Sequence, residues 1–98
     1  MLVQELDLFI ECCLECESIF IKMNNDRAAN ILRDCADLNI LLNVFINRKS
    51  EIEKPLLLCC LDAWKRCKEI LDENDEIPEI ERCSHICSMC IEDYKSYI

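Results

Sequence analysis

The sequence contains no glycine and only two prolines among its 98 residues. Glycine-rich phosphate-binding loops are therefore excluded, because they need a backbone without side chains close to the ligand. Histidine occurs once, as His85. This histidine does not share a helical face with the cysteines, so a nucleophile–base pair for covalent catalysis has little support. The sequence predicts a protein that is not an enzyme.

Basic residues and long apolar runs are also scarce. The chain has 11 Lys and Arg against 20 Asp and Glu, a formal net charge of −9, and nucleic-acid binding needs a basic face instead. No apolar stretch approaches the roughly 20 residues of a membrane span. The first residues include acids but no base before Phe9, unlike a secretory signal. We therefore expect a cytoplasmic protein with reduced thiols and no nucleic-acid or membrane partner.

The polar breaks in the sequence predict four helices. Asparagine can adopt the left-handed conformation that ends a helix where glycine is absent, and Ser50 with Glu53 has the spacing of a capping box. The predicted helices span 3–24, 26–47, 51–73 and 77–97. Short connections between four helices of similar length predict an all-α fold, an antiparallel up-down four-helix bundle that forms one domain over residues 1–98.

Cysteine is unusually abundant, with ten residues in the chain. Such a content in a short chain is typical of a disulfide scaffold or a metal site. The stretch 81–94, ERCSHICSMCIEDY, places Cys83, Cys87 and Cys90 four and then three residues apart. This alternation puts the three thiols on one face of a helix, the face that a bundle directs toward its axis.

The same alternation predicts an inward-facing stripe on every helix. All of its positions are apolar or cysteine: Leu6, Phe9, Cys13, Cys16, Phe20 and Met23; Ala28, Ile31, Cys35, Leu38, Leu42 and Phe45; Leu57, Cys60, Trp64, Cys67 and Leu71; Ile80, Cys83, Cys87, Cys90 and Tyr94. At about 1.5 Å rise per residue, the eight cysteines of the stripe share one central zone. Cys12 and Cys59 adjoin inward cysteines and are expected to point elsewhere.

Eight thiols in one zone predict a soft-metal site. Thiolate-rich sites without histidine bind Cu(I), Zn(II) or iron–sulfur clusters. One zinc ion needs only four ligands, and an iron–sulfur cluster is usually held by four cysteines, whereas Cu(I) accepts few ligands and bridging thiolates. Cu(I) is therefore the predicted metal, with Zn(II) or an iron–sulfur cluster as alternatives. The predicted ligands are Cys13, Cys16, Cys35, Cys60, Cys67, Cys83, Cys87 and Cys90.

Two other functional classes remain open at this stage. Free cysteine packs as a small hydrophobic residue, so the chain could be a structural or interaction bundle with cysteines in its core. Alternatively, the vicinal pairs Cys12–Cys13 and Cys59–Cys60 could be oxidisable sites of a thiol redox sensor. A disulfide scaffold is disfavoured, because cysteines four apart on one helix rarely have suitable geometry.

The segment 33–37, RDCAD, resembles the R-[DE]-C-A-D segment of the bacterial four-helix-bundle copper storage proteins. The Cys83-x3-Cys87-x2-Cys90 run is similar to the last helix of that family, and Cys60-x6-Cys67 fits two positions of its third helix. The resemblance implies a bundle, often a homo-tetramer, that stores many Cu(I) ions on inward cysteines. The absent signal peptide resembles the cytosolic branch of the family.

The chain departs from the resembled family in its number of inward cysteines. By register, other residues occupy family cysteine positions: Phe9, Phe20, Ala28, Asn39, Leu57, Trp64, Leu71, Ile80 and Tyr94. The resemblance therefore implies a cysteine-depleted member, in which one compact central cluster replaces a filled bundle and serves copper storage or buffering.

Overall fold

The structure is a computed structural model that describes the backbone of residues 2–97 and the side chains of residues 4–94. Its helices are α1 (Leu2–Lys22), α2 (Asp26–Asn47), α3 (Glu53–Asp72) and α4 (Pro78–Tyr97). Each end lies within two residues of the predicted one. Residues 2–97 contain no strand, so the predicted all-α class is confirmed.

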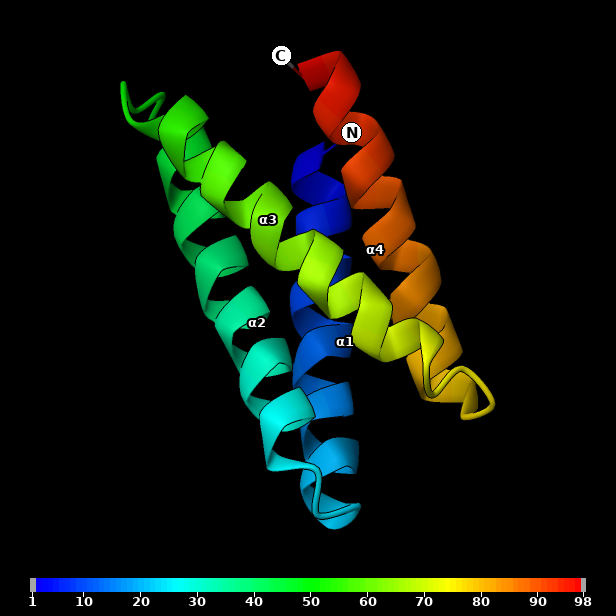
Figure 1. The fold of residues 1–98 in the computed structure, drawn as a ribbon. Coiled ribbons are helices and arrows are strands. Elements are labelled where there is room, and N and C mark those ends of the chain that lie inside the picture. The colour runs from blue at the N-terminus through cyan, green and yellow to red at the C-terminus, as the bar shows by residue number, and fades with distance from the viewer. Residues whose placement is uncertain (1, 98) are drawn as a thin grey trace.

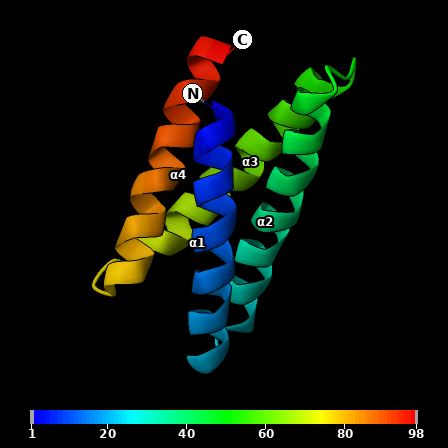
Figure 2. The same cartoon turned by 180° about the vertical axis from the view of Figure 1, so that it is seen from behind.

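The helices alternate in direction and form a bundle. Each helix contacts the next one along the chain, and α4 contacts α1 to close the arrangement. The two ends of the chain lie at the same end of the bundle (Figures 1 and 2). Helices α1 and α2 run side by side, whereas α3 crosses the bundle obliquely (Figure 1). The predicted antiparallel up-down four-helix bundle is confirmed.

The first turn follows from its asparagines. Asn24 has a φ of 59°, in the left-handed region, which asparagine tolerates because its short polar side chain can hydrogen-bond locally. Asn25 caps α2, since its side-chain oxygen accepts a hydrogen bond from the Ala28 amide at 3.2 Å. These two residues end one helix and begin the next without glycine.

The second turn differs from the prediction. Helix α3 begins at Glu53, two residues later than expected, so the predicted capping box of Ser50 and Glu53 is wrong. The Ser50 hydroxyl accepts a hydrogen bond from the Ile52 amide at 3.1 Å instead. Lys49 has a φ of 55°, a conformation that costs a non-glycine residue about 1–2 kcal/mol.

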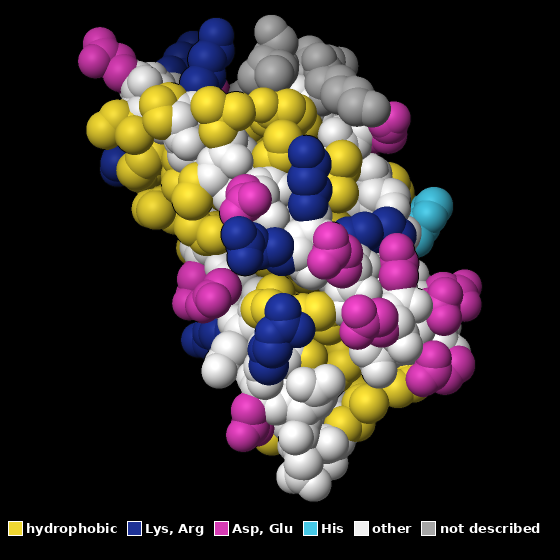
Figure 3. Space-filling view, in the orientation of Figure 1, with side chains coloured by type: hydrophobic (Ala, Val, Ile, Leu, Met, Phe, Trp, Pro, Cys, Tyr) yellow, Lys and Arg dark blue, Asp and Glu magenta, His cyan; other side chains and the backbone are white. Residues whose placement is uncertain are grey.

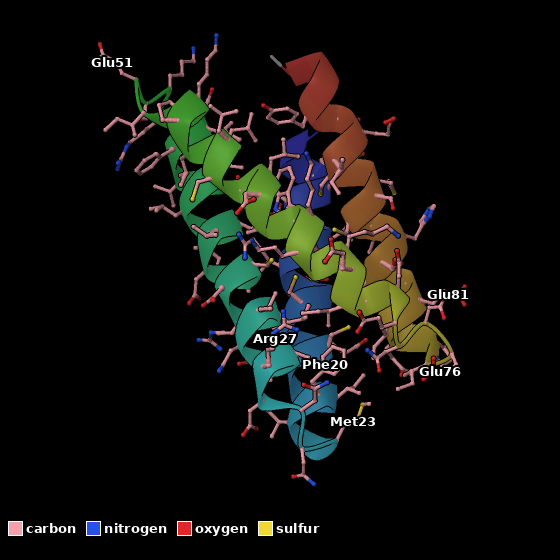
Figure 4. The ribbon with its side chains drawn as sticks, in the orientation of Figure 1. Phe20, Met23, Arg27, Glu51, Glu76 and Glu81 are labelled. Atoms are coloured by element: carbon pink, nitrogen blue, oxygen red, sulfur yellow. The ribbon has the colours of Figure 1, made fainter. Side chains whose placement is uncertain are left out.

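The predicted inward-facing positions form the core, except for one position where the prediction is wrong. Met23 is 43% exposed, because α1 ends at Lys22 and Met23 lies in the turn beyond it (Figure 4). Phe20, one turn earlier, is fully buried. Of the other inward positions, four are half-buried and the rest are buried; the half-buried ones are Ile31, Leu38, Phe45 and Tyr94. Among the described residues, no helix is long and apolar enough to cross a membrane.

Candidate metal centre

The eight cysteines predicted as ligands are all fully buried. Two come from α1, one from α2, two from α3 and three from α4. All ten cysteines of the chain are free thiols. Their burial follows from the three-and-four spacing, which keeps each of the eight on the face that its helix packs against the others.

Cys67 interacts with one thiol from each of the other three helices. Its side chain, on α3, interacts with Cys13 of α1, Cys35 of α2 and Cys87 of α4. Cys13, Cys35 and Cys87 lie near the middle of their helices, and Cys67 lies five residues before the end of α3, which crosses the bundle obliquely. The bundle therefore brings one thiol from each helix into a single group.

Cys83 makes a second group between α4 and α1. Its thiol interacts with Cys12, Cys13 and Cys16, and the Cys12 and Cys83 Sγ atoms lie 3.0 Å apart. Cys12 is only 1% exposed, so the prediction that it points elsewhere is wrong. We name the seven cysteines of the two groups the thiol network: Cys12, Cys13, Cys16, Cys35, Cys67, Cys83 and Cys87.

Helical geometry explains why Cys12 is buried and Cys59 is exposed. With 3.6 residues per turn, Cys12 lies about 80° from the centre of the α1 stripe, whereas Cys59 lies about 120° from that of α3. Cys12 therefore sits on the flank that faces α4, and Cys59 is exposed, as predicted. The sequence holds this signal, because Cys12 stands three residues after Phe9 and four before Cys16.

A layer of two aromatic rings and one buried amide adjoins the thiol network one turn toward the N-terminal end of α1. The rings of Phe9 and Trp64 have their centroids 6.4 Å apart at an interplanar angle of 53°. The Trp64 indole Nε1 donates a hydrogen bond to Asn39 Oδ1 at 2.7 Å, and all three side chains are fully buried. We name Phe9, Asn39 and Trp64 the aromatic layer.

Cys60 and Cys90 border the network and still interact electrostatically with its thiols, Cys60 with Cys35 and Cys90 with Cys87, Cys12 and Cys13. Cys60 precedes Trp64 by one turn of α3, and Cys90 follows Cys87 by one turn of α4. The Cys60 thiol donates to the Leu38 carbonyl oxygen at 3.8 Å. These two predicted ligands are therefore buried at the edge of the thiol zone, not at its centre.

Several network thiols donate to backbone carbonyl oxygens of a neighbouring helix. Cys16 donates to Glu79 at 3.6 Å. Cys35 donates to Ala63 at 3.5 Å, and Cys87 donates to Trp64 at 3.3 Å. Metal ligands are thiolates, so metal binding has to remove these protons and release them to solvent.

The network does not ionise evenly. Burial opposes ionisation of Cys13, but hydrogen bonds from Cys67 and Cys83 outweigh it and lower the Cys13 pKa to about 6. The pKa values of Cys67 and Cys83 are raised, first by their hydrogen bonds with neighbouring thiols and then by burial. Burial raises the pKa of Cys60 to about 12 and also raises that of Cys90.

The metal-free thiols of Cys12 and Cys83 contact each other directly. Among the described side chains, no group of three or more Cys, His, Asp or Glu already surrounds a point suited to a metal ion. Metal–sulfur distances of about 2.3 Å put two sulfurs on a tetrahedral ion roughly 3.8 Å apart. The Sγ atoms of Cys12 and Cys83, at 3.0 Å, must therefore separate by about 1 Å, which side-chain rotation can supply. His85 is exposed and takes no part in the zone.

Comparison with known proteins agrees with this chemistry. The family model described as copper storage protein matches residues 3–98, nearly the whole chain. Neither the comparison with curated proteins nor that with solved structures found a match. Family membership implies copper storage through cysteines and binding of Cu(I), and the family is non-enzymatic, in agreement with the predictions. The chain belongs to the copper storage protein family.

Proposed function

We propose that the protein stores or buffers Cu(I) in one compact cluster at the centre of the bundle. The observation that carries this proposal is the interaction of buried free thiols from all four helices. The eight predicted ligands remain the proposed set: Cys13, Cys16, Cys35, Cys60, Cys67, Cys83, Cys87 and Cys90. Cu(I) suits this arrangement because soft thiolates select it and can bridge between ions.

The compact size of the cluster follows from the apolar residues at its two ends. Phe9 and Trp64 occupy one side of the thiol network, and Phe20, Leu71 and Ile80 occupy the other; all are fully buried. These side chains fill volume with atoms that cannot bind Cu(I). We therefore propose a cysteine-depleted storage protein of lower capacity than a bundle lined by thiols along its whole length.

An anaerobic titration with Cu(I) tests the proposal, with Trp64 as the reporter. Trp64 is the only tryptophan, and its carbonyl oxygen accepts from the Cys87 thiol. Emission should fall until the cluster fills, and the endpoint should not exceed the number of buried cysteines. Stoichiometric binding with unchanged emission would place the metal elsewhere. A one-ion endpoint with Zn(II), and none with Cu(I) against a competing chelator, would favour a zinc site.

We also propose that the protein self-associates, as the resemblance to tetrameric family members implies. Exposed apolar side chains gather where α2 ends and α3 begins (Figure 3). They are Ile40, Leu41, Val44, Ile52 and Leu58. Patches of this kind are common at protein interfaces. Light scattering should show an oligomer, and Leu58→Glu should reduce its mass; a monomeric wild-type protein would contradict the proposal.

A cytoplasmic location, within the cytosolic branch of the family, is the last part of the proposal. Ten free thiols support it, because thiols persist in reducing compartments and pair into disulfides in oxidising ones. Fractionation of the native cells should recover the protein with the cytoplasm. Recovery from an extracytoplasmic fraction would overturn this part and leave Cu(I) binding untouched.

A further inference from the structure

We infer that the centre of the cluster, between the edge ligands Cys60 and Cys90, consists of two subsites that share Cys13, and that Cys12 is a ligand of one of them. The four-helix subsite comprises Cys13, Cys35, Cys67 and Cys87. The α1–α4 subsite comprises Cys12, Cys13, Cys16 and Cys83. This inference rests on the proposed function, since it names the arrangement within the same thiol zone.

The position of Cys12 carries the first part of the inference. Its Sγ lies 3.0 Å from Cys83 Sγ and 3.4 Å from the Phe9 carbonyl oxygen, and its side chain is 1% exposed. A Cu(I) ion that binds Cys83 therefore meets Cys12 with little movement. Cys59, the corresponding extra cysteine of α3, is exposed and lies outside this arrangement.

The sharing of Cys13 follows from the two groups of interactions. Cys67 interacts with one thiol from each of the other helices, whereas Cys83 interacts only with thiols of α1. Cys13 is the one cysteine common to both groups. A Cu(I) ion in each group would therefore have Cys13 as a bridging thiolate.

Electrostatics favours the shared arrangement. A buried thiolate is costly unless positive charge lies beside it. Two Cu(I) ions bring only two positive charges, and a thiolate that bridges both ions gives each of them a ligand without burying a further negative charge. Each ion also neutralises part of the charge of its neighbour's ligands, so the second ion binds a site that the first has begun to form.

Three alanine variants test the inference, with metal-free helicity measured by circular dichroism to confirm folding. Native mass spectrometry would count the Cu(I) ions retained against a competing chelator. Cys59→Ala should match the wild-type protein, and Cys12→Ala should hold at least one ion fewer. Cys13→Ala should lose more ions than Cys12→Ala, because it serves both subsites. Equal counts for Cys12→Ala and Cys59→Ala would overturn the role of Cys12.

A measurement on the wild-type protein tests the sharing of Cys13 without any substitution. X-ray absorption at two Cu(I) ions per chain should show a copper neighbour around copper, because a bridging thiolate holds two ions close together. Copper surrounded only by sulfur at this loading would overturn the shared arrangement. A wild-type protein that binds no Cu(I) would instead refute the proposed function itself.

Discussion

The thiol network, built from all four helices, and the aromatic layer, built from α1, α2 and α3, are neighbours in the bundle but fill it differently. In the network, small polarisable thiols interact with one another. In the aromatic layer, Trp64 packs against Phe9 and its indole is fixed by a 2.7 Å hydrogen bond to Asn39. The comparison shows that sulfur atoms able to bind metal line one part of the bundle axis. In the adjacent part, buried side chains stabilise the fold without metal.

The vicinal cysteine pairs show the same contrast. Cys12 and Cys13 are both buried in the network, whereas the pair on α3 has Cys60 buried and Cys59 exposed. Helices α1 and α3 both pack between α2 and α4, but α1 contacts these two helices more extensively, so its buried face is wide enough for both thiols. Helix α3 crosses obliquely (Figure 1) and exposes the neighbours of its stripe, including Leu58 at 57%.

The largest expected effect distinguishes the network from Cys60 and Cys90 at the edge of the thiol zone. A variant in which alanine replaces Cys35, Cys67, Cys83 and Cys87 should not bind Cu(I) tightly, because each of the two groups of thiols loses its central cysteine, Cys67 or Cys83. Replacing Cys60 and Cys90 should leave most of the binding. Anaerobic titration against a competing chelator measures both variants. Equal losses would show that Cys60 and Cys90 do not lie at the edge of the site.

The second prediction concerns the accessibility of the two vicinal pairs. In the metal-free protein, an alkylating reagent should modify Cys59 at least ~1,000 times faster than Cys12, since a stability of even 5 kcal/mol keeps the opened state rarer than that. Mass spectrometry of the digested protein measures the two rates. In concentrated guanidinium the rates should become equal. Comparable rates under native conditions would mean that α1 opens locally beside α4.

Much of this contrast could be predicted from the sequence. Polar breaks and the three-and-four spacing were enough to predict four helices and the burial of all eight inward cysteines. The error on Cys12 arose because a strict stripe is narrower than the face that a tightly packed helix buries. The error on Met23 arose at a helix end, where spacing alone does not show where the helix stops.

The pairing of particular thiols could not be predicted in the same way. Which sulfur meets which depends on the axial offset between helices and on their crossing angles, and neither is encoded in the spacing within one helix. Cys83 therefore interacts with three thiols of α1, and Cys67 with one from each other helix, although each lies five residues from the helix end at the turn that joins α3 and α4.

The third prediction asks how strongly the apolar part of the bundle stabilises the fold. Leu57 is fully buried one turn before Cys60, and its neighbour Leu58 is mostly exposed. Leu57→Ala should lower the free energy of unfolding of the metal-free protein by about 2–5 kcal/mol. Leu58→Ala should change it by less than about 0.5 kcal/mol. Urea denaturation measures both, and similar values would show that α3 is not anchored by its inward stripe.

The smallest expected effect comes from Glu5, whose charge acts on Cys90. Burial, a hydrogen bond with Asp93 and the charge of Asp93 raise the Glu5 pKa from 4.5 to about 7. The folded protein therefore holds this proton between pH 4.5 and 7 while the unfolded chain releases it. The contribution of Glu5 to stability should fall as pH rises through this window and then level off, by on the order of 1 kcal/mol. Ionisation of Cys13, with its pKa of about 6, makes stability rise with pH instead, but it acts equally in the wild-type and Glu5→Gln proteins and cancels in their difference.

Glu5→Gln should remove this decline, because glutamine keeps the shape of the side chain without a titrating proton. Asp72 does not obscure the result, since hydrogen bonds from Ser84 and Lys68 lower its pKa below its ordinary value of 3.8. Thermal unfolding of the metal-free wild-type and Glu5→Gln proteins from pH 4.5 to 8 measures the difference. Parallel curves would mean that Glu5 ionises normally and that its negative charge already faces Cys90 at pH 5. In that case, the negative charge of Glu5 would oppose ionisation of the Cys90 thiol from about pH 5 upward.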